Sequence, residues 1–198
     1  MSTPKTLLEL AGADLTPSAL DKAALVLIDI QNEYLEGPIA VSRAGPAIDK
    51  AAALLAAARK AGTPVIHVAH KGRAGSLFDR DAARGQIVDA LTPADGEDVV
   101  EKGLPNSFAG TGLDALVRAS GRKELILAGF MTHMCVSSTA RAALDLGYRV
   151  TVDADASGTR DLPDGEGGTV KAADLHRTAL AELADRFAII ARGHDWGA

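Results

Sequence analysis

Short, uninterrupted apolar runs alternate with longer segments of helical periodicity along most of this chain. The run at residues 24–28 contains no polar position, which is typical of a strand buried on both faces. The segment at 48–60 is rich in Ala and Leu, and the helix-ending residues Gly62 and Pro64 follow it. Repeated strand–helix–strand units predict a parallel sheet with helices on both faces, which is a three-layer α/β/α fold.

Six apolar runs and four helical segments fit this pattern. The predicted strands are residues 24–28, 64–68, 98–101, 125–128, 149–152 and 187–190, and the predicted helices are residues 48–60, 113–119, 135–146 and 170–186. Two stretches do not fit it. We interpret the Gly-, Arg- and Asp-rich residues 71–92 as an active-site loop, and the polar residues 157–168 as either a lid or a solvated connection.

Length and composition limit the class of protein. A chain of 198 residues predicts one domain spanning residues 1–198, with residues 1–20 as an N-terminal extension. The net charge of −5 argues against nucleic-acid binding, and the single cysteine excludes an internal disulfide framework or a Cys-rich zinc site. No apolar run approaches the roughly 20 residues that span a bilayer. The first residues lack a signal-peptide core, so we expect a cytoplasmic protein without membrane contact.

Three reactive side chains follow predicted strands. Asp29 comes after the first, Lys102 after the third and Cys135 just after the fourth. Because ligands of open parallel sheets collect at the carboxyl ends of the strands, we expect these side chains to meet there. Together they supply a base, a cation and a nucleophile, which suits amide hydrolysis through a thioester.

Each of these residues also has a structural alternative. Cys135 opens a predicted helix, whose dipole is expected to lower the pKa of the thiol, but a lone cysteine can equally be a small buried apolar residue. Asp29 interrupts an apolar run, where its carboxylate needs a partner, or it caps the following helix. Lys102 alone would be interpreted as a solvated surface lysine.

The histidines and one turn offer further contacts. His67 and His70 lie three positions apart near one strand end, so pleat alternation directs them to opposite faces and disfavours a shared metal. His70 alone can line a pocket. His133 precedes Cys135 by two residues; it can contact substrate, whereas a Cys–His dyad between such near neighbours is poorly placed. Asn106 lies in a segment that offers polar donors after the third strand, or is a plain turn.

Three segments carry a resemblance to a known family. They are Leu-Ile-Asp-Ile-Gln-Asn-Glu-Tyr at 27–34, Val-Glu-Lys-Gly-Leu-Pro-Asn-Ser-Phe at 100–108 and Gly-Phe-Met-Thr-His-Met-Cys-Val at 129–136. In order and spacing the chain resembles the isochorismatase-like cysteine hydrolase superfamily from about residue 23 to residue 190. Each motif alone is modest, but three in register are specific.

The resemblance implies a Rossmann-like sheet of six parallel strands in the order 3-2-1-4-5-6, and an Asp–Lys–Cys triad formed by Asp29, Lys102 and Cys135. It also implies a cis peptide between Phe130 and Met131, and an oxyanion hole made by the backbone N–H groups of Met131 and Cys135. We expect substrate contacts from Gln31, Tyr34, His70, Asn106, Phe108, Phe130 and His133.

Members of the superfamily divide by chemistry. Nicotinamidases carry an Asp-x-His metal site between the first two strands, whereas this chain has no histidine before His67, so we expect no metal and no cofactor. Isochorismatases cleave a vinyl ether and often lack the cysteine. Cys135 therefore favours hydrolysis of a C–N bond in a small amide, carbamoyl or ureido compound. The alternatives are isochorismatase-type ether hydrolysis that does not need Cys135, and a non-catalytic binder or thiol sensor.

The expected partners are a small-molecule substrate and further copies of the chain. Helices rich in small residues can pack closely, and members of the superfamily form oligomers. We therefore expect a homo-oligomer, either a dimer or a tetramer.

Overall fold

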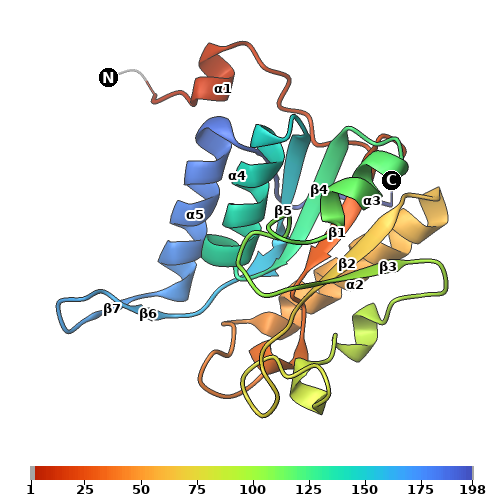
Figure 1. Cartoon of the computed structure of the whole chain (residues 1–198). Helices are drawn as coiled ribbons and strands as arrows, with labels where there is room; N and C mark the ends of the chain where they lie inside the picture. The colour runs from red at the N-terminus through yellow and green to blue at the C-terminus, as the bar shows by residue number, and fades with distance from the viewer. Residues whose placement is uncertain (1–2, 198) are drawn as a thin grey trace.

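A computed structural model describes residues 3–197 of the chain, and its centre is a six-stranded parallel sheet (Figure 1). The sheet has the order β3-β2-β1-β4-β5-β8, and all five neighbouring pairs are parallel. Its strands are β1 (Ala23–Ile28), β2 (Val65–His70), β3 (Asp98–Lys102), β4 (Glu124–Phe130), β5 (Arg149–Gly158) and β8 (Ile189–Ala191). Because β8 is the sixth strand of this sheet in chain order, the predicted fold and strand order are confirmed.

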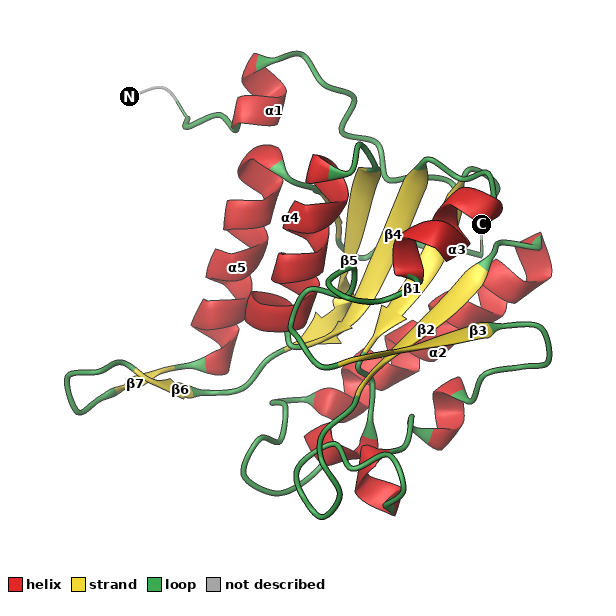
Figure 2. Cartoon of the chain, viewed as in Figure 1, coloured by secondary structure: helices red, strands yellow, loops and turns green. Residues whose placement is uncertain are grey.

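Helices cover both faces of the sheet, as Figure 2 shows. α2 lies on one face, while α3, α4 and α5 lie on the other (Figure 2). The helices are α1 (Leu7–Leu10), α2 (Ala44–Ala61), α3 (Leu113–Ala119), α4 (Ser137–Asp145) and α5 (Ala172–Arg186). Short turns complete the set: the 3-10 helices η1 (Asn32–Tyr34), η2 (Ala83–Gly85) and η3 (Asp89–Leu91), and the π-helical turn η4 (Thr132–Val136).

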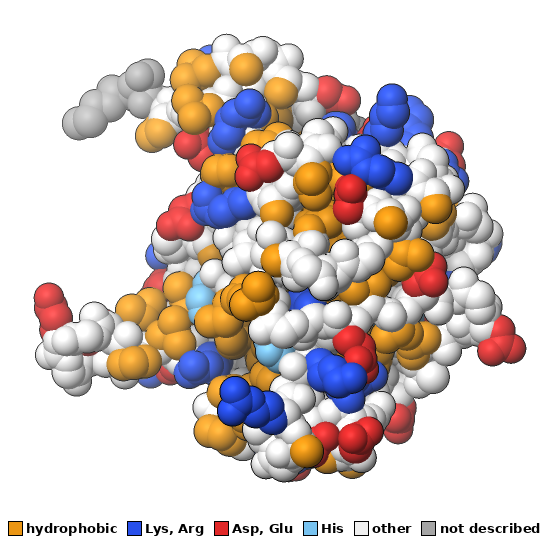
Figure 3. Space-filling view, in the orientation of Figure 1, with side chains coloured by type: hydrophobic (Ala, Val, Ile, Leu, Met, Phe, Trp, Pro, Cys, Tyr) orange, Lys and Arg blue, Asp and Glu red, His pale blue; other side chains and the backbone are white. Residues whose placement is uncertain are grey.

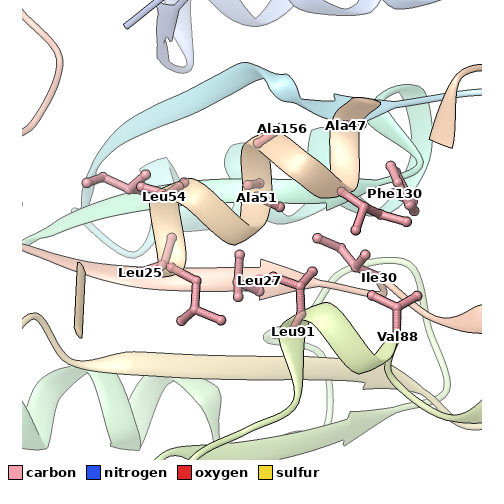
Figure 4. Close-up of a cluster of buried hydrophobic side chains, with 14 of the residues drawn as sticks. Leu25, Leu27, Ile30, Ala47, Ala51, Leu54, Val88, Leu91, Phe130 and Ala156 are labelled. Carbon is pink, nitrogen blue, oxygen red and sulfur yellow. The ribbon is translucent and has the colours of Figure 1, made fainter. Parts of the chain in front are cut away.

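The uninterrupted apolar run of β1 is explained by the two faces of the sheet. Leu25 and Leu27 belong to the hydrophobic cluster beneath α2, where Leu54 also lies (Figure 4). Val26 and Ile28 alternate with them and belong to the cluster on the opposite face. All six residues of β1 are buried, so neither face of the strand tolerates a polar side chain.

Two elements, α2 and β5, exceed their predicted lengths the most. α2 begins at Ala44, four residues before the predicted start. Gly45 and Pro46 resemble helix breakers, but proline is tolerated in the first turn, where an N–H has no intrahelical partner. β5 extends from the predicted end at residue 152 to Gly158, because Ser157 and Gly158 pair with β4 beyond a register shift. At this irregularity the Asp153 carboxylate accepts the N–H groups of Asp155 and Ala156 at 2.9 Å.

The two unassigned stretches have different structures. Residues 71–92 contain η2 and η3 and lie with the loop after β1 beneath the carboxyl edge of the sheet (Figure 1). Residues 157–168 contain the end of β5 and enter an antiparallel hairpin of β6 (Leu162–Pro163) and β7 (Thr169–Val170), which projects from the body (Figure 1). Within residues 3–197, no helix is long and apolar enough to cross a membrane.

Candidate active site

The carboxyl edge of the sheet brings Asp29, Lys102 and Cys135 together. Asp29 follows β1 directly, Lys102 is the last residue of β3, and Cys135 lies in η4 after β4. The Lys102 ammonium Nζ lies 2.6 Å from Asp29 Oδ2 and donates a hydrogen bond to Cys135 Sγ at 3.3 Å. The three residues are 0%, 2% and 3% exposed. Strand ends that are distant in the chain therefore assemble a buried acid–cation–thiol cluster.

The carboxylate of Asp29 is incompletely satisfied. Only its Oδ2 is paired with Lys102, and its Oδ1 has no hydrogen-bond partner of normal geometry among the residues that the structure describes. Burial raises the pKa of Asp29, although the Lys102 ammonium and the Cys135 thiol act in the opposite direction. A carboxylate with raised proton affinity and a free oxygen is suited to take up a proton.

The thiol of Cys135 differs from the sequence expectation. Burial and the Asp29 carboxylate raise its pKa to about 12, and Lys102 only partly opposes them. The predicted lowering of this pKa at a helix N-terminus is wrong, because Cys135 lies inside the π-helical turn that precedes α4 and is largely shielded from solvent. The resting group is therefore a neutral thiol that needs a base.

The two histidines of β2 point to opposite faces, as pleat alternation predicted. His70 Nδ1 lies 3.3 Å from Lys102 Nζ, while His67 Nε2 lies 2.9 Å from a Glu97 carboxylate oxygen. Burial and the Lys102 charge lower the pKa of His70 to about 4. His70 is thus neutral at pH 7 and can accept a hydrogen bond from Lys102.

The Gln31 side chain links segments of the site through hydrogen bonds rather than pointing into the site. Its Nε2 donates to the carbonyl oxygens of His70 and Gly85, at 3.0 and 2.7 Å, and its Oε1 accepts the N–H of His70 at 2.8 Å. The side chain is fully buried. These bonds tie the end of β1 to β2 and to the 71–92 loop, which favours a positioning role over the predicted substrate contact.

An aromatic wall borders the site. The Tyr34 ring lies 5.7 Å from that of Phe130, which was predicted to contact substrate, and 5.2 Å from that of Phe78. Phe78 also lies 4.9 Å from the His70 ring. Sequence reasoning missed Phe78, although a single aromatic residue in a polar, Gly-rich loop was an available signal.

Arg160 is a second residue that sequence reasoning missed. It lies two residues beyond β5 and is half-buried, and its Nε is buried without a hydrogen-bond partner within residues 3–197. Its positive charge acts on Tyr34 and on His133, whose pKa is lowered mainly by burial. The predicted end of the strand at residue 152 concealed this cation, because the true strand delivers it to the carboxyl edge.

The remaining predicted contacts are tied to neighbouring residues. His133 Nδ1 lies 2.6 Å from Thr159 Oγ1. Asn106 Oδ1 accepts the N–H of Phe108 at 2.9 Å, which is a local turn. The Phe108 ring stacks on Tyr148 at 6.1 Å and packs against the cluster that contains Cys135. This geometry favours the plain-turn alternative for Asn106.

The backbone of the Cys135 segment agrees with the resemblance in one feature. The peptide bond between Phe130 and Met131 is cis. In the part of the chain that the structure describes, no group of three or more His, Cys, Asp or Glu side chains is arranged to hold a metal ion. The arrangement as a whole offers a thiol, a base, a cation and a half-buried guanidinium at one edge.

Comparison with known proteins agrees with this arrangement. The isochorismatase domain model matches residues 23–195. A secreted isochorismatase effector of Verticillium dahliae is 40% identical over 185 residues, covering 93% of this chain and 95% of that protein. A crystal structure of an isochorismatase from Pseudomonas putida matches with a TM-score of 0.92 at 44% identity, covering 96% of this chain and 97% of that one.

A third relative carries the name of a C–N hydrolase. A ureidoacrylate amidohydrolase of Methylobacterium radiotolerans is 32% identical over 205 residues, covering 84% of this chain and 76% of that protein. The Verticillium relative is described as secreted. The cytoplasmic location expected for this chain therefore stays a prediction.

Proposed function

Since this chain belongs to the isochorismatase family of hydrolases, we propose that it hydrolyses the C–N bond of a small amide, carbamoyl or ureido compound through a thioester on Cys135. One observation carries the proposal: Lys102 Nζ lies 2.6 Å from Asp29 Oδ2 and 3.3 Å from Cys135 Sγ in a buried cluster. The named amidohydrolase among the relatives supports the choice of bond.

In the proposed mechanism Asp29 acts first as base and then as acid. It takes the proton of the Cys135 thiol, since the high pKa of that thiol leaves little thiolate at neutral pH. The sulfur attacks the amide carbon, and Lys102 stabilises the negative charge on sulfur as the proton leaves. The backbone N–H groups of Met131 and Cys135 are proposed to hold the oxyanion.

Collapse of the adduct breaks the C–N bond. The leaving nitrogen takes the proton from Asp29, so the products of this half-reaction are ammonia or an amine and a thioester on Cys135. Water then attacks the thioester carbon and gives its proton to Asp29. The acid product departs, the sulfur regains a proton, and the starting state is restored.

The position of Arg160 favours a substrate that carries a negative charge. Its guanidinium has a buried Nε without a partner in the described chain, and its charge acts on Tyr34 and His133 beside the triad. A guanidinium binds carboxylates through paired, charge-assisted hydrogen bonds. We therefore propose a substrate in which a carboxylate accompanies the amide or ureido group.

The test is a panel of primary amides, N-carbamoyl amino acids, ureido acids and a vinyl ether of the isochorismate type, assayed for ammonia release and for loss of the ether. We expect turnover of C–N substrates and, with a slow substrate, an acyl adduct on Cys135 in intact-mass spectra. Cys135→Ala should abolish turnover, whereas Met134→Ala, in the same turn and 39% exposed, should retain it. Full turnover by Cys135→Ala would remove the proposal and favour ether hydrolysis.

The carboxylate preference has its own variant. Arg160→Gln should raise KM for ureido acids by about tenfold or more while leaving KM for uncharged amides nearly unchanged, since a charge-assisted hydrogen bond is lost only with the former. An equal change in KM for both classes would contradict the assigned role of Arg160 without affecting the triad.

A further inference from the structure

A cavity of about 490 Å³ opens beside the candidate active site, and none of the three triad residues lines it. Its walls are formed by the start of α2, the end of β5, the start of α5 and the residue after β8. Pockets for small molecules range from roughly 300 to 1,000 Å³. The cavity therefore has the volume of a separate ligand site.

Two hydrogen bonds show how near the cavity lies to the triad. Thr159 in its wall lies 2.6 Å from His133 Nδ1, through its hydroxyl. His176, also in its wall, places Nδ1 2.9 Å from the hydroxyl of Thr132. Thr132 and His133 belong to η4, the turn that carries Cys135. An occupant would thus contact two residues that are hydrogen-bonded to the active-site turn, without reaching the triad.

The charge of the cavity is opposite to that of the whole chain. Arg43, Lys50, Arg177 and Arg192 line it, against one carboxylate, Asp155, whereas the chain has a net charge of −5. In the described part of the chain, no carboxylate oxygen lies within 4.0 Å of a charged nitrogen of Arg43, Lys50 or Arg192. Three of the four basic residues in the wall thus have no ion-pair partner within residues 3–197, and Asp155 is the one carboxylate among the lining residues.

The other two charged groups already have partners. Arg177 pairs with Asp174 at 3.0 Å, and Asp155 Oδ2 accepts the N–H of Gly193 at 2.5 Å. On the face shown in Figure 3, by contrast, acidic and basic side chains are interspersed. A concave surface lined by one sign of charge concentrates the field and attracts an opposite charge.

We propose that this cavity binds a phosphorylated small molecule. Guanidinium groups match phosphate oxygens with paired hydrogen bonds, and a phosphate monoester supplies nearly two negative charges for the three unpaired cations. Pro46, Ala47 and Ala172 supply apolar wall for the remainder of such a ligand.

Calorimetric titration with inorganic pyrophosphate at constant ionic strength tests the site. We expect a dissociation constant below about 1 mM for the full chain. The double variant Arg43→Gln, Arg192→Gln should bind at least about tenfold more weakly, since it loses two charge-assisted contacts. The control variant Lys22→Gln, Lys123→Gln removes the same charge from exposed lysines outside the cavity and should bind like the unaltered protein.

Two further arms locate the ligand and define its chemistry. Cys135→Ser and Arg160→Gln should retain pyrophosphate binding, because neither residue lines the cavity. Malonate should bind at least about tenfold more weakly than pyrophosphate, since a carboxylate carries less charge than a phosphate. Binding weaker than about 10 mM, equal loss in the control double variant, loss in Arg160→Gln alone, or equal affinity for malonate would each overturn the proposal.

Discussion

Two largely buried carboxylates lie near β2, and they differ in how fully their oxygens are occupied. Glu97 accepts two hydrogen bonds of 2.8 Å from the guanidinium of Arg59 and one of 2.9 Å from the N–H of Ala94, and His67 lies 2.9 Å away. These partners, Arg59 foremost, lower the pKa of Glu97 to about 2. Glu97 is therefore negatively charged at neutral pH.

Asp29 is the opposite case. One oxygen is paired with Lys102, the other has no hydrogen bond of normal geometry in the described chain, and burial raises the pKa of the carboxyl group. A carboxylate whose oxygens are all hydrogen-bonded, here called saturated, is stabilised as the anion and stabilises the fold. A buried carboxylate with an unbonded oxygen retains an affinity for protons. The difference indicates which of the two carboxylates can take part in proton transfer, and the following variants test it.

The largest expected difference is in turnover. Asp29→Asn should lower amide turnover by about 10²- to 10⁴-fold, because the amide can neither protonate the leaving nitrogen nor accept a proton from the attacking water. Glu97→Gln, the matched change at the saturated site, should leave turnover within about twofold. Ammonia release at saturating substrate measures both, and comparable losses in the two variants would remove the distinction.

Glu97 should contribute to the stability of the fold rather than to turnover. Glu97→Gln weakens the charge-assisted bonds to Arg59 and should lower the free energy of unfolding by about 1.5–3 kcal/mol. As a control, Arg118→Gln breaks an exposed pair with Asp114 and should lower the free energy of unfolding by less than Glu97→Gln does, because solvent screens the pair. Urea unfolding provides both values; a cost for Glu97→Gln no larger than for the control would show that saturation does not stabilise the fold.

The alkylation rate of the Cys135 thiol tests how the Asp29 carboxylate acts on it. Because the Asp29 carboxylate helps to raise the pKa of Cys135, Asp29→Asn should accelerate alkylation by iodoacetamide at pH 7.5 by about tenfold. Lys102→Gln should slow it, since Lys102 favours the thiolate. Mass spectrometry of the alkylated cysteine gives the rates. An unchanged alkylation rate in Asp29→Asn would show that the charge of Asp29 does not affect the pKa of Cys135.

The smallest effect is a dependence on pH at the saturated site. The folded-state pKa of Glu97 is lowered to about 2, so its stabilisation is complete above the unfolded-state value of about 4.3 and is lost as pH falls toward 2. The stability gap between the unaltered protein and Glu97→Gln should therefore shrink below about pH 4. Burial also lowers the pKa of His67, which is why the gap is compared rather than the stability alone. A gap constant from pH 6 to about pH 3 would contradict the assignment.

Much of the fold and the position of the triad could be predicted from the sequence. The apolar run of β1 predicted a doubly covered strand, and the positions of Asp29, Lys102 and Cys135 after strands placed them at one edge. The polar end of β5 could not be recognised, because Ser157 and Gly158 are held by pairing with β4 beyond a register shift, which no local pattern reveals. With the strand end misplaced, Arg160 had no predicted location.

Local pattern by itself determined the order of elements, since a strand or helix buries its face through the period of its own residues. Only the tertiary structure decided the chemical state of the groups at the edge. The pKa of the Cys135 thiol depends on burial and on Asp29 and Lys102, which are distant in the sequence. Whether a carboxylate is saturated, as Glu97 is, or has a free oxygen, as Asp29 has, likewise depends on which segments fold against it. Electrostatic energy depends on distance in space and on exclusion of water, and neither is encoded in the local sequence.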